Sequence, residues 1–102
     1  MKKVLLGLVA YLVALSVHAF EDNGKTITVV GIQKEYTAYF RVSEGLSQTC
    51  KHNVIYLRID SEFGKAAYAN ILTAKSTGKK LSRIVYVQNP DETCHLSLVQ
   101  HD

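Results

Sequence analysis

The first nineteen residues limit what the rest of the chain can build. Two lysines precede an apolar run over residues 4–15, and Val17-His18-Ala19 puts small residues at the two positions that a signal peptidase recognises. This three-part layout is typical of a secretory signal peptide. A membrane anchor is the alternative, but a spanning helix needs about 20 apolar residues and this run is shorter. We therefore expect residues 1–19 to be removed, leaving one domain over 20–102 that is periplasmic or secreted from a bacterium and has no membrane span.

The two cysteines fit an exported domain of this size. Removal of nineteen residues from 102 leaves 83, and a chain this short buries only about 60% of its surface, so its core is marginal. Cys50 and Cys94 both lie in this part, and in an oxidising compartment such a pair predicts a disulfide. Closing a loop of this length contributes about 4 kcal/mol in the chain-entropy model. The alternative is two free thiols, with Cys50 and nearby His52 as a nucleophile pair, but no third orienting group is evident.

Hydrophobic periodicity and turn residues divide the domain into six elements. Short segments rich in β-branched residues or with alternating polarity predict strands, and Gly31 marks a bulge or a close approach inside the first of them. The turn after the second strand is Ser-Glu-Gly, and an Asn-Pro-Asp-Glu turn separates the last two strands. The expected strands are 26–33, 37–42, 53–60, 81–88 and 94–100.

A single amphipathic helix is expected between the third and fourth strands. Asp60 or Ser61 can cap its start and Gly78 is a suitable residue to end it. Apolar residues recur at helical spacing along one face, and we expect that face to be buried. The face consists of Phe63, Ala67, Ile71 and Ala74, widened by Tyr68 and Leu72.

The order strand, strand, strand, helix, strand, strand predicts a mainly β fold with one helix. Five short strands with a helix after the third are typical of an OB-fold-like five-stranded barrel. A flat α+β sheet with the helix across one face is the alternative. Periodicity does not separate the two.

The sequence indicates a protein that binds rather than catalyses. There is no H-E-x-x-H, no G-x-S-x-G and no phosphate-binding glycine loop, so no catalytic residue, cofactor or enzyme activity is predicted. His95 and His101 are six residues apart on one strand, about 20 Å, which is too far to share a metal ion. Removing the two leader lysines from twelve basic residues leaves ten against nine acids, a net charge of +1, and this gives no basic footprint for nucleic acid.

Tyrosine supplies the only signal for a binding surface. The mature part holds five tyrosines and no tryptophan, and tyrosine offers a binding surface an apolar ring with a polar tip. Tyr56, Tyr68 and Tyr86 are expected to fill strand and helix faces, whereas Tyr36 and Tyr39 lie near the turn between the first two strands. The candidate ligand-binding residues are Tyr36, Tyr39, Arg41 and Ser43.

Several short motifs carry a family resemblance. Val30-Gly31-Ile32 leads to Ala38-Tyr39-Phe40, and the helix ends in Ser76-Thr77-Gly78-Lys79 before the strand that begins near Arg83. In these motifs the chain resembles the B subunits of the subtilase-cytotoxin and typhoid-toxin type, relatives of the pertussis toxin binding subunits. Residues 68–99 also resemble small exported bacterial proteins of unknown role. The toxin group has a cysteine where this chain has Arg41.

The resemblance implies an OB-fold, a ring of five subunits, recognition of host-surface glycans and a separate catalytic A subunit. In such a ring the helices line a central channel and edge strands pair between neighbours. An alternative from a different class is a monomeric periplasmic protein that binds or inhibits a protein partner.

Overall fold

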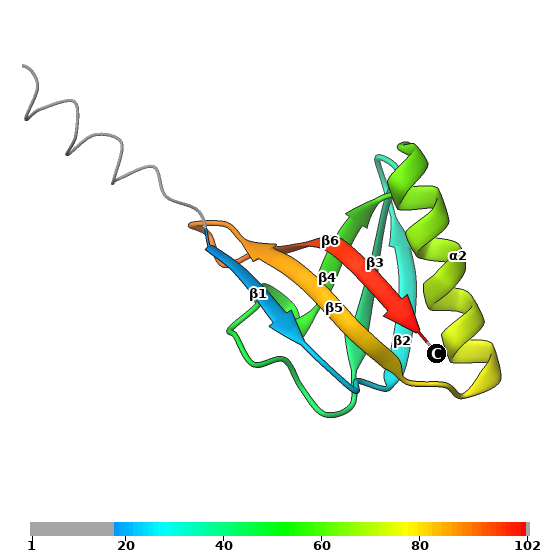
Figure 1. The fold of residues 1–102 in the computed structure, drawn as a ribbon. Helices are drawn as coiled ribbons and strands as arrows, with labels where there is room; N and C mark the ends of the chain where they lie inside the picture. Colours follow the sequence, from blue (N-terminus) through cyan, green and yellow to red (C-terminus); the bar gives the residue numbers. More distant parts are fainter. Residues whose placement is uncertain (1–17, 102) are drawn as a thin grey trace, which may run out of the picture.

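The structure, a computed structural model, describes residues 18–101 (Figure 1). Most of the predicted signal peptide, residues 1–17, lies outside the described residues, and no helix within 18–101 is long and apolar enough to cross a membrane. This described part contains two helical segments, the 3-10 turn η1 (Lys51–Asn53) and the helix α2 (Glu62–Thr77). The strands are β1 (His18–Asp22), β2 (Ile27–Gln33), β3 (Thr37–Val42), β4 (Ile55–Arg58), β5 (Leu81–Gln88) and β6 (Cys94–His101).

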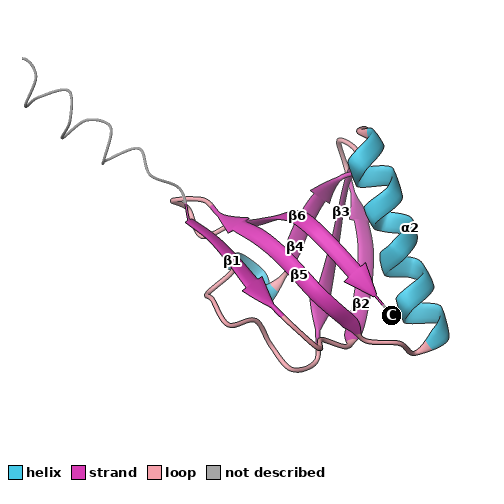
Figure 2. Ribbon diagram, viewed as in Figure 1, coloured by secondary structure: helices cyan, strands magenta, loops and turns pink. Residues whose placement is uncertain are grey.

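The described strands form one open six-stranded sheet, with one α-helix beside it (Figure 2). The strand order is β1-β5-β6-β4-β3-β2, and all neighbours are antiparallel except β4 and β6. The prediction of a mainly β fold with one helix is confirmed. The predicted five-stranded barrel is wrong, because the structure has an open sheet with an additional strand, β1, which pairs with β5 through Phe20 and Tyr86. The predicted cleavage after Ala19 falls inside this strand.

The sheet is strongly curled, so the flat alternative is also wrong. Strands β1 and β2 lie at opposite ends of the strand order but are consecutive in the chain. Five strand spacings in a flat sheet would separate them by about 24 Å, whereas the connection from Asp22 to Ile27 reaches at most about 18 Å. The sheet must therefore coil, and a bridge between Lys25 and Leu81 joins the connection to the start of β5. Figure 1 shows β5 and β6 passing in front of β3 and β4, with β1 beside β5.

Helix α2 packs on the sheet through small residues. Ser61 caps its start by accepting a hydrogen bond from the amide of Gly64, and Gly78 ends it in the left-handed conformation, as expected. A Cβ atom at Gly64 would lie 1.4 Å from the carbonyl oxygen of Arg58, so only glycine allows this approach to the end of β4. The buried residues of the helix are Gly64, Ala67, Ile71 and Ala74.

The predicted burial of two larger helix residues is wrong. Phe63 is 46% exposed and Leu72 is 40% exposed. The first buried residue of the helix is Gly64, not Phe63. The face of α2 that contacts the sheet is therefore turned by one residue relative to the predicted face. Tyr68 packs partly against the core, and Ala67 and Ile71 are buried as predicted.

A disulfide and a buried carboxylate fix the long loop between β3 and β4. Cys50 and Cys94 are joined, with Cα atoms 5.5 Å apart, which confirms the predicted pair. Asp22 is buried and accepts hydrogen bonds from the hydroxyl of Tyr86 (2.7 Å) and from the amide of Ser47 (3.1 Å). Burial by itself raises the pKa of Asp22, but the hydrogen bonds from Ser47 and Tyr86 outweigh it and hold that pKa below its ordinary value. These contacts tie the loop to β1 and β5.

Candidate functional site

A row of side chains crosses four strands on the outer face of the sheet. The strand register places Gly31 of β2 opposite Tyr39 of β3, Tyr39 opposite Tyr56 of β4, and Tyr56 opposite His95 of β6. The flanking residue Ala38 is buried, and successive side chains of a strand point to opposite faces. The row therefore lies on the face away from the core. Its rings are evenly spaced, with centroids 6.2 Å apart for Tyr39 and Tyr56 and 6.1 Å apart for Tyr56 and His95.

Gly31 gives Tyr39 its position in this row. A Cβ atom at Gly31 would lie 2.3 Å from the ring carbon Cζ of Tyr39. The Tyr39 ring therefore lies directly over the glycine backbone, and a larger residue would displace the ring tip. Gly31 was expected to mark a bulge or a close approach, and the structure shows a close approach at this position.

Two adjoining depressions lie along the row, with volumes of about 310 Å³ and 350 Å³. Both are open to solvent and share three lining residues, Gln33, His52 and Tyr56. We call the first the Lys51 subsite, which is further lined by Thr37, Lys51, Thr93 and His95. We call the second the Arg41 subsite, which is further lined by Tyr39, Arg41 and Val54.

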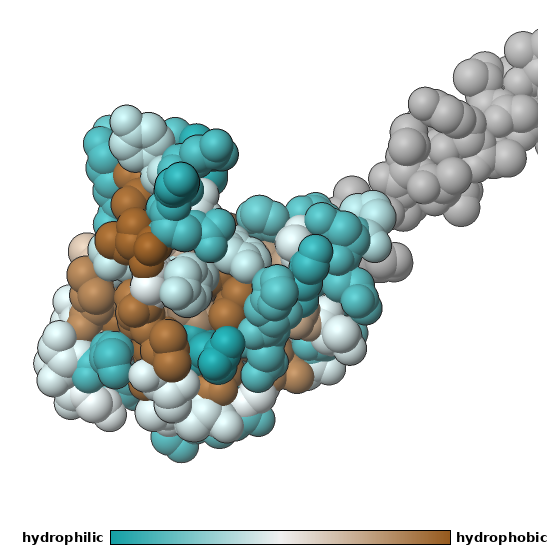
Figure 3. Space-filling view, turned by 180° about the vertical axis from the view of Figure 1, so that it is seen from behind, coloured by the Kyte–Doolittle hydropathy of each residue, from teal (hydrophilic) through white to brown (hydrophobic). Residues whose placement is uncertain are grey.

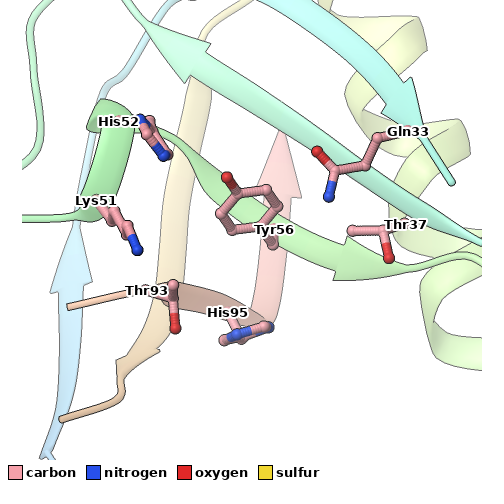
Figure 4. A pocket seen from close by; sticks show the side chains of 7 residues that line it. All are labelled: Gln33, Thr37, Lys51, His52, Tyr56, Thr93 and His95. Atoms are coloured by element: carbon pink, nitrogen blue, oxygen red, sulfur yellow. The ribbon is translucent and has the colours of Figure 1, made fainter. Parts of the chain in front are cut away.

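Tyr56 lies at the centre of the Lys51 subsite (Figure 4). Gln33 and Thr37, from the ends of β2 and β3, stand on one side of its ring, and Lys51 and His52 from η1 stand on the other. Thr93 and His95 are also close to Tyr56, at the start of β6. Residues from four other elements, β2, β3, η1 and β6, therefore surround this tyrosine of β4.

The η1 turn that forms one wall of the site is held in a strained conformation. His52 and Asn53 both have positive φ, 60° and 58°, a region that residues other than glycine rarely occupy. Such strain persists only where the surroundings hold it, and it clusters at ligand-binding positions. Here Arg41 donates a hydrogen bond to the carbonyl oxygen of His52 (3.1 Å), and the amide of Lys51 donates to the carbonyl of Glu92 (2.7 Å). The disulfide at Cys50 adjoins the turn on the other side.

The site is positive in character. Neither depression is lined by an aspartate or glutamate, while Arg41 and Lys51 each line one. Within residues 18–101, neither cation takes part in an ion pair. Asp91 lies outside both depressions, and its pKa is lowered first by the hydrogen bonds it accepts from the hydroxyl and amide of Thr93 and then by the charge of Lys51. The outer face can therefore accept a ligand with an anionic group.

The structure separates the four candidate ligand-binding residues into two pairs. Tyr39 and Arg41 line the Arg41 subsite. Tyr36 is 67% exposed in the turn between β2 and β3, and Ser43 is exposed after β3; neither lines a depression.

Sequence reasoning missed the other half of the site. Tyr56 was expected to fill a strand face, His52 was considered as a nucleophile partner of Cys50, and His95 was considered as a metal ligand. The missing information is the parallel pairing of β4 with β6, since it brings residues 39 positions apart into contact. The alternation of residues 55–59 placed Tyr56 on the outer face, but nothing in the sequence placed His95 beside it.

Large hydrophobic residues are also exposed outside the site. The face of the molecule seen from behind has brown, hydrophobic surface bordered by teal, hydrophilic surface (Figure 3). Phe63 and Leu72 do not form one patch, because nine residues at 3.6 per turn place them half a turn apart on α2. The exposed large hydrophobic residues are Val29, Ile32, Tyr36, Phe63 and Leu72.

Comparisons with protein-family models, with curated proteins and with solved structures gave no match to this chain.

Proposed function

We propose that this protein is an exported, non-enzymatic binding module whose outer sheet face binds a glycan. The observation that carries the proposal is the Tyr39–Tyr56–His95 row lying across two adjoining depressions. Aromatic rings offer flat apolar surfaces for the faces of sugar rings, and their polar tips offer hydrogen bonds to hydroxyl groups. Gln33, Thr37 and Thr93 add polar groups around the rings, which is the mixture of apolar wall and few polar contacts found in ligand sites.

The position of the row within the sheet supports the same function. We infer a relationship to the OB-fold in which β2 to β6 correspond to its five strands and β1 is additional. OB-folds bind oligonucleotides and oligosaccharides on the face of their second and third strands and with the loops between strands 1 and 2 and strands 4 and 5. In this numbering those strands are β3 and β4, which carry Tyr39 and Tyr56. Tyr36 lies in the first of the loops, and Thr93 ends the second.

The resemblance to toxin B subunits extends the proposal to host-surface glycans, a ring of five subunits and a catalytic partner chain. The disulfide is consistent with export to an oxidising compartment. Light scattering on the processed, oxidised protein tests the assembly separately from ligand binding. A mass five times that of the monomer supports the ring, and a monomeric mass at high concentration removes it.

A glycan array tests the binding function directly. The processed protein should bind a defined subset of glycans, and Tyr56→Ala should abolish that binding while circular dichroism shows that the variant still folds. Gly31→Ala should weaken binding by displacing Tyr39. Phe63→Ala is the matched aromatic control, because Phe63 is partly exposed on α2 and lines neither depression.

The array also distinguishes the alternative function. Absence of binding to every glycan, together with a monomeric mass, would contradict the proposal and favour a periplasmic protein that binds or inhibits a protein partner. Binding that survives Tyr56→Ala would place the glycan site elsewhere on the molecule.

A further inference from the structure

The two depressions on the outer face form a divided site, not one pocket. They share Gln33, His52 and Tyr56, and each has its own remaining lining residues. These shared residues lie between the Arg41 subsite, which is lined by residues of β3, and the Lys51 subsite, which extends to the start of β6. A ligand that fills both regions must therefore run across the strands, from Tyr39 past Tyr56 to His95.

Each subsite contains one basic side chain, an arginine or a lysine. Arg41 lines one and Lys51 lines the other, while His52 lines both. Among residues 18–101, the side chain of Lys51 has no hydrogen-bond partner, and Arg41 uses one donor on the carbonyl of His52. A guanidinium has five N–H donors, so Arg41 can hold the η1 turn and still bind a ligand oxygen.

The spacing of the rings suits consecutive units of a polymer. The two ring-to-ring steps are nearly equal, 6.2 Å and 6.1 Å, and a sugar unit advances a glycan chain by a comparable distance. A single sugar could occupy one subsite only, which would leave the cation of the other without a partner. A chain with one anionic group for each subsite would satisfy both cations.

We propose that the ligand is a linear acidic oligosaccharide, in which two neighbouring units each present a carboxylate or sulfate, one to Arg41 and one to Lys51, on either side of Tyr56. This inference rests on the proposed glycan-binding function and adds the length and charge of the ligand. Charge-assisted hydrogen bonds are the stronger ones in proteins. The second anionic unit should therefore strengthen binding by about tenfold or more.

Calorimetry on the full, processed and oxidised protein tests the inference with two series of probes. The acidic series is mannuronate, its dimer and its trimer, and the neutral series is N-acetylglucosamine, chitobiose and chitotriose. We expect the mannuronate dimer to bind about tenfold or more tightly than the monomer and than chitobiose. A κ-carrageenan tetrasaccharide, which carries sulfate and no carboxylate, is measured in parallel and distinguishes sulfate from carboxylate as the preferred anion.

Matched charge variants test the role of each cation. Lys51→Gln and Arg41→Gln should each reduce affinity for the acidic dimer about tenfold and leave affinity for the acidic monomer less affected. Lys79→Gln is the control, because Lys79 is exposed after α2 and lines neither subsite. Lys51→Gln is the decisive variant, since among residues 18–101 the Lys51 side chain makes no hydrogen bond or ion pair that its loss would break.

The outcomes separate this inference from the proposed function. Equal affinity for acidic monomer and dimer would overturn the two-subsite arrangement, and tighter binding of the neutral series would overturn the anionic ligand; both leave glycan binding standing. Absence of binding to any sugar, here and on the array, would overturn the inference and the proposed function together.

Discussion

Removing the disulfide should cost this domain a large part of its stability. The bridge closes a loop with a sequence separation of 44 residues, for which the chain-entropy relation gives about 4 kcal/mol near room temperature. A domain of about 83 residues has roughly 4–12 kcal/mol in total. Cys94 is fully buried and Cys50 nearly so, which makes the double variant Cys50→Ala/Cys94→Ala preferable to serine, because serine would bury hydroxyl groups.

Urea unfolding followed by circular dichroism measures this effect. A loss of about 4 kcal/mol should lower the urea midpoint by roughly 1–4 M at the slopes typical of small proteins. The wild-type protein under reducing conditions should shift toward the variant, and the variant itself should not respond to reductant. An unchanged midpoint in the double variant would refute the reasoning, since it would mean that the loop between the cysteines is already constrained in the unfolded chain.

Three further predictions concern the helix and one exposed carboxylate. Gly64→Ala should destabilise by about 3 kcal/mol or more, beyond the usual range for overpacking, because the added methyl group meets backbone; a melting temperature equal to the wild type would contradict this contact. Phe63→Ala should cost about 1–2 kcal/mol and Ile71→Ala about 2–5 kcal/mol, and the reverse ranking in urea unfolding would count against the assigned helix face. Glu44 accepts hydrogen bonds from the amide and hydroxyl of Thr26 (2.7 Å each), which lower its pKa from 4.5 to about 2. The contribution of Glu44 to stability should therefore be complete above pH 4.5 and disappear as the pH falls toward 2. Glu44→Gln should remove this pH dependence of stability. An NMR titration that gives Glu44 an ordinary pKa would refute the prediction.

Local patterns predicted the elements of this fold well. The alternation of Ile55, Leu57 and Ile59 gave the correct buried face of β4, and the capping residues Ser61 and Gly78 gave the correct ends of α2. Such features depend on neighbours in the sequence, which a single chain displays directly. The disulfide was equally accessible, because only two cysteines were available to pair.

The errors came from tertiary contacts. Phe63 has the hydrophobicity of a core residue, but Gly64 brings the helix so close to the carbonyl of Arg58 that the contact face turns toward the glycine. Strand β1 was missed because residues 18–19 also fit a signal-peptidase site and because the next residues, Phe20 to Asp22, show no long alternation. Its formation depends on β5, which lies more than 60 residues away in the chain.

The candidate binding face depends on local sequence patterns and on tertiary contacts. The disulfide connects the two segments that form it. Cys94 is paired with Ile55 across the parallel strands, so the register that places the cysteine also places His95 beside Tyr56. A slip of one residue would turn Tyr56 toward the core. On the other side of the bridge, Cys50 precedes the η1 turn that carries the remaining wall of the site. The covalent link that compensates for a small core therefore also fixes the two segments whose meeting forms the site, and neither segment by itself indicates a binding function.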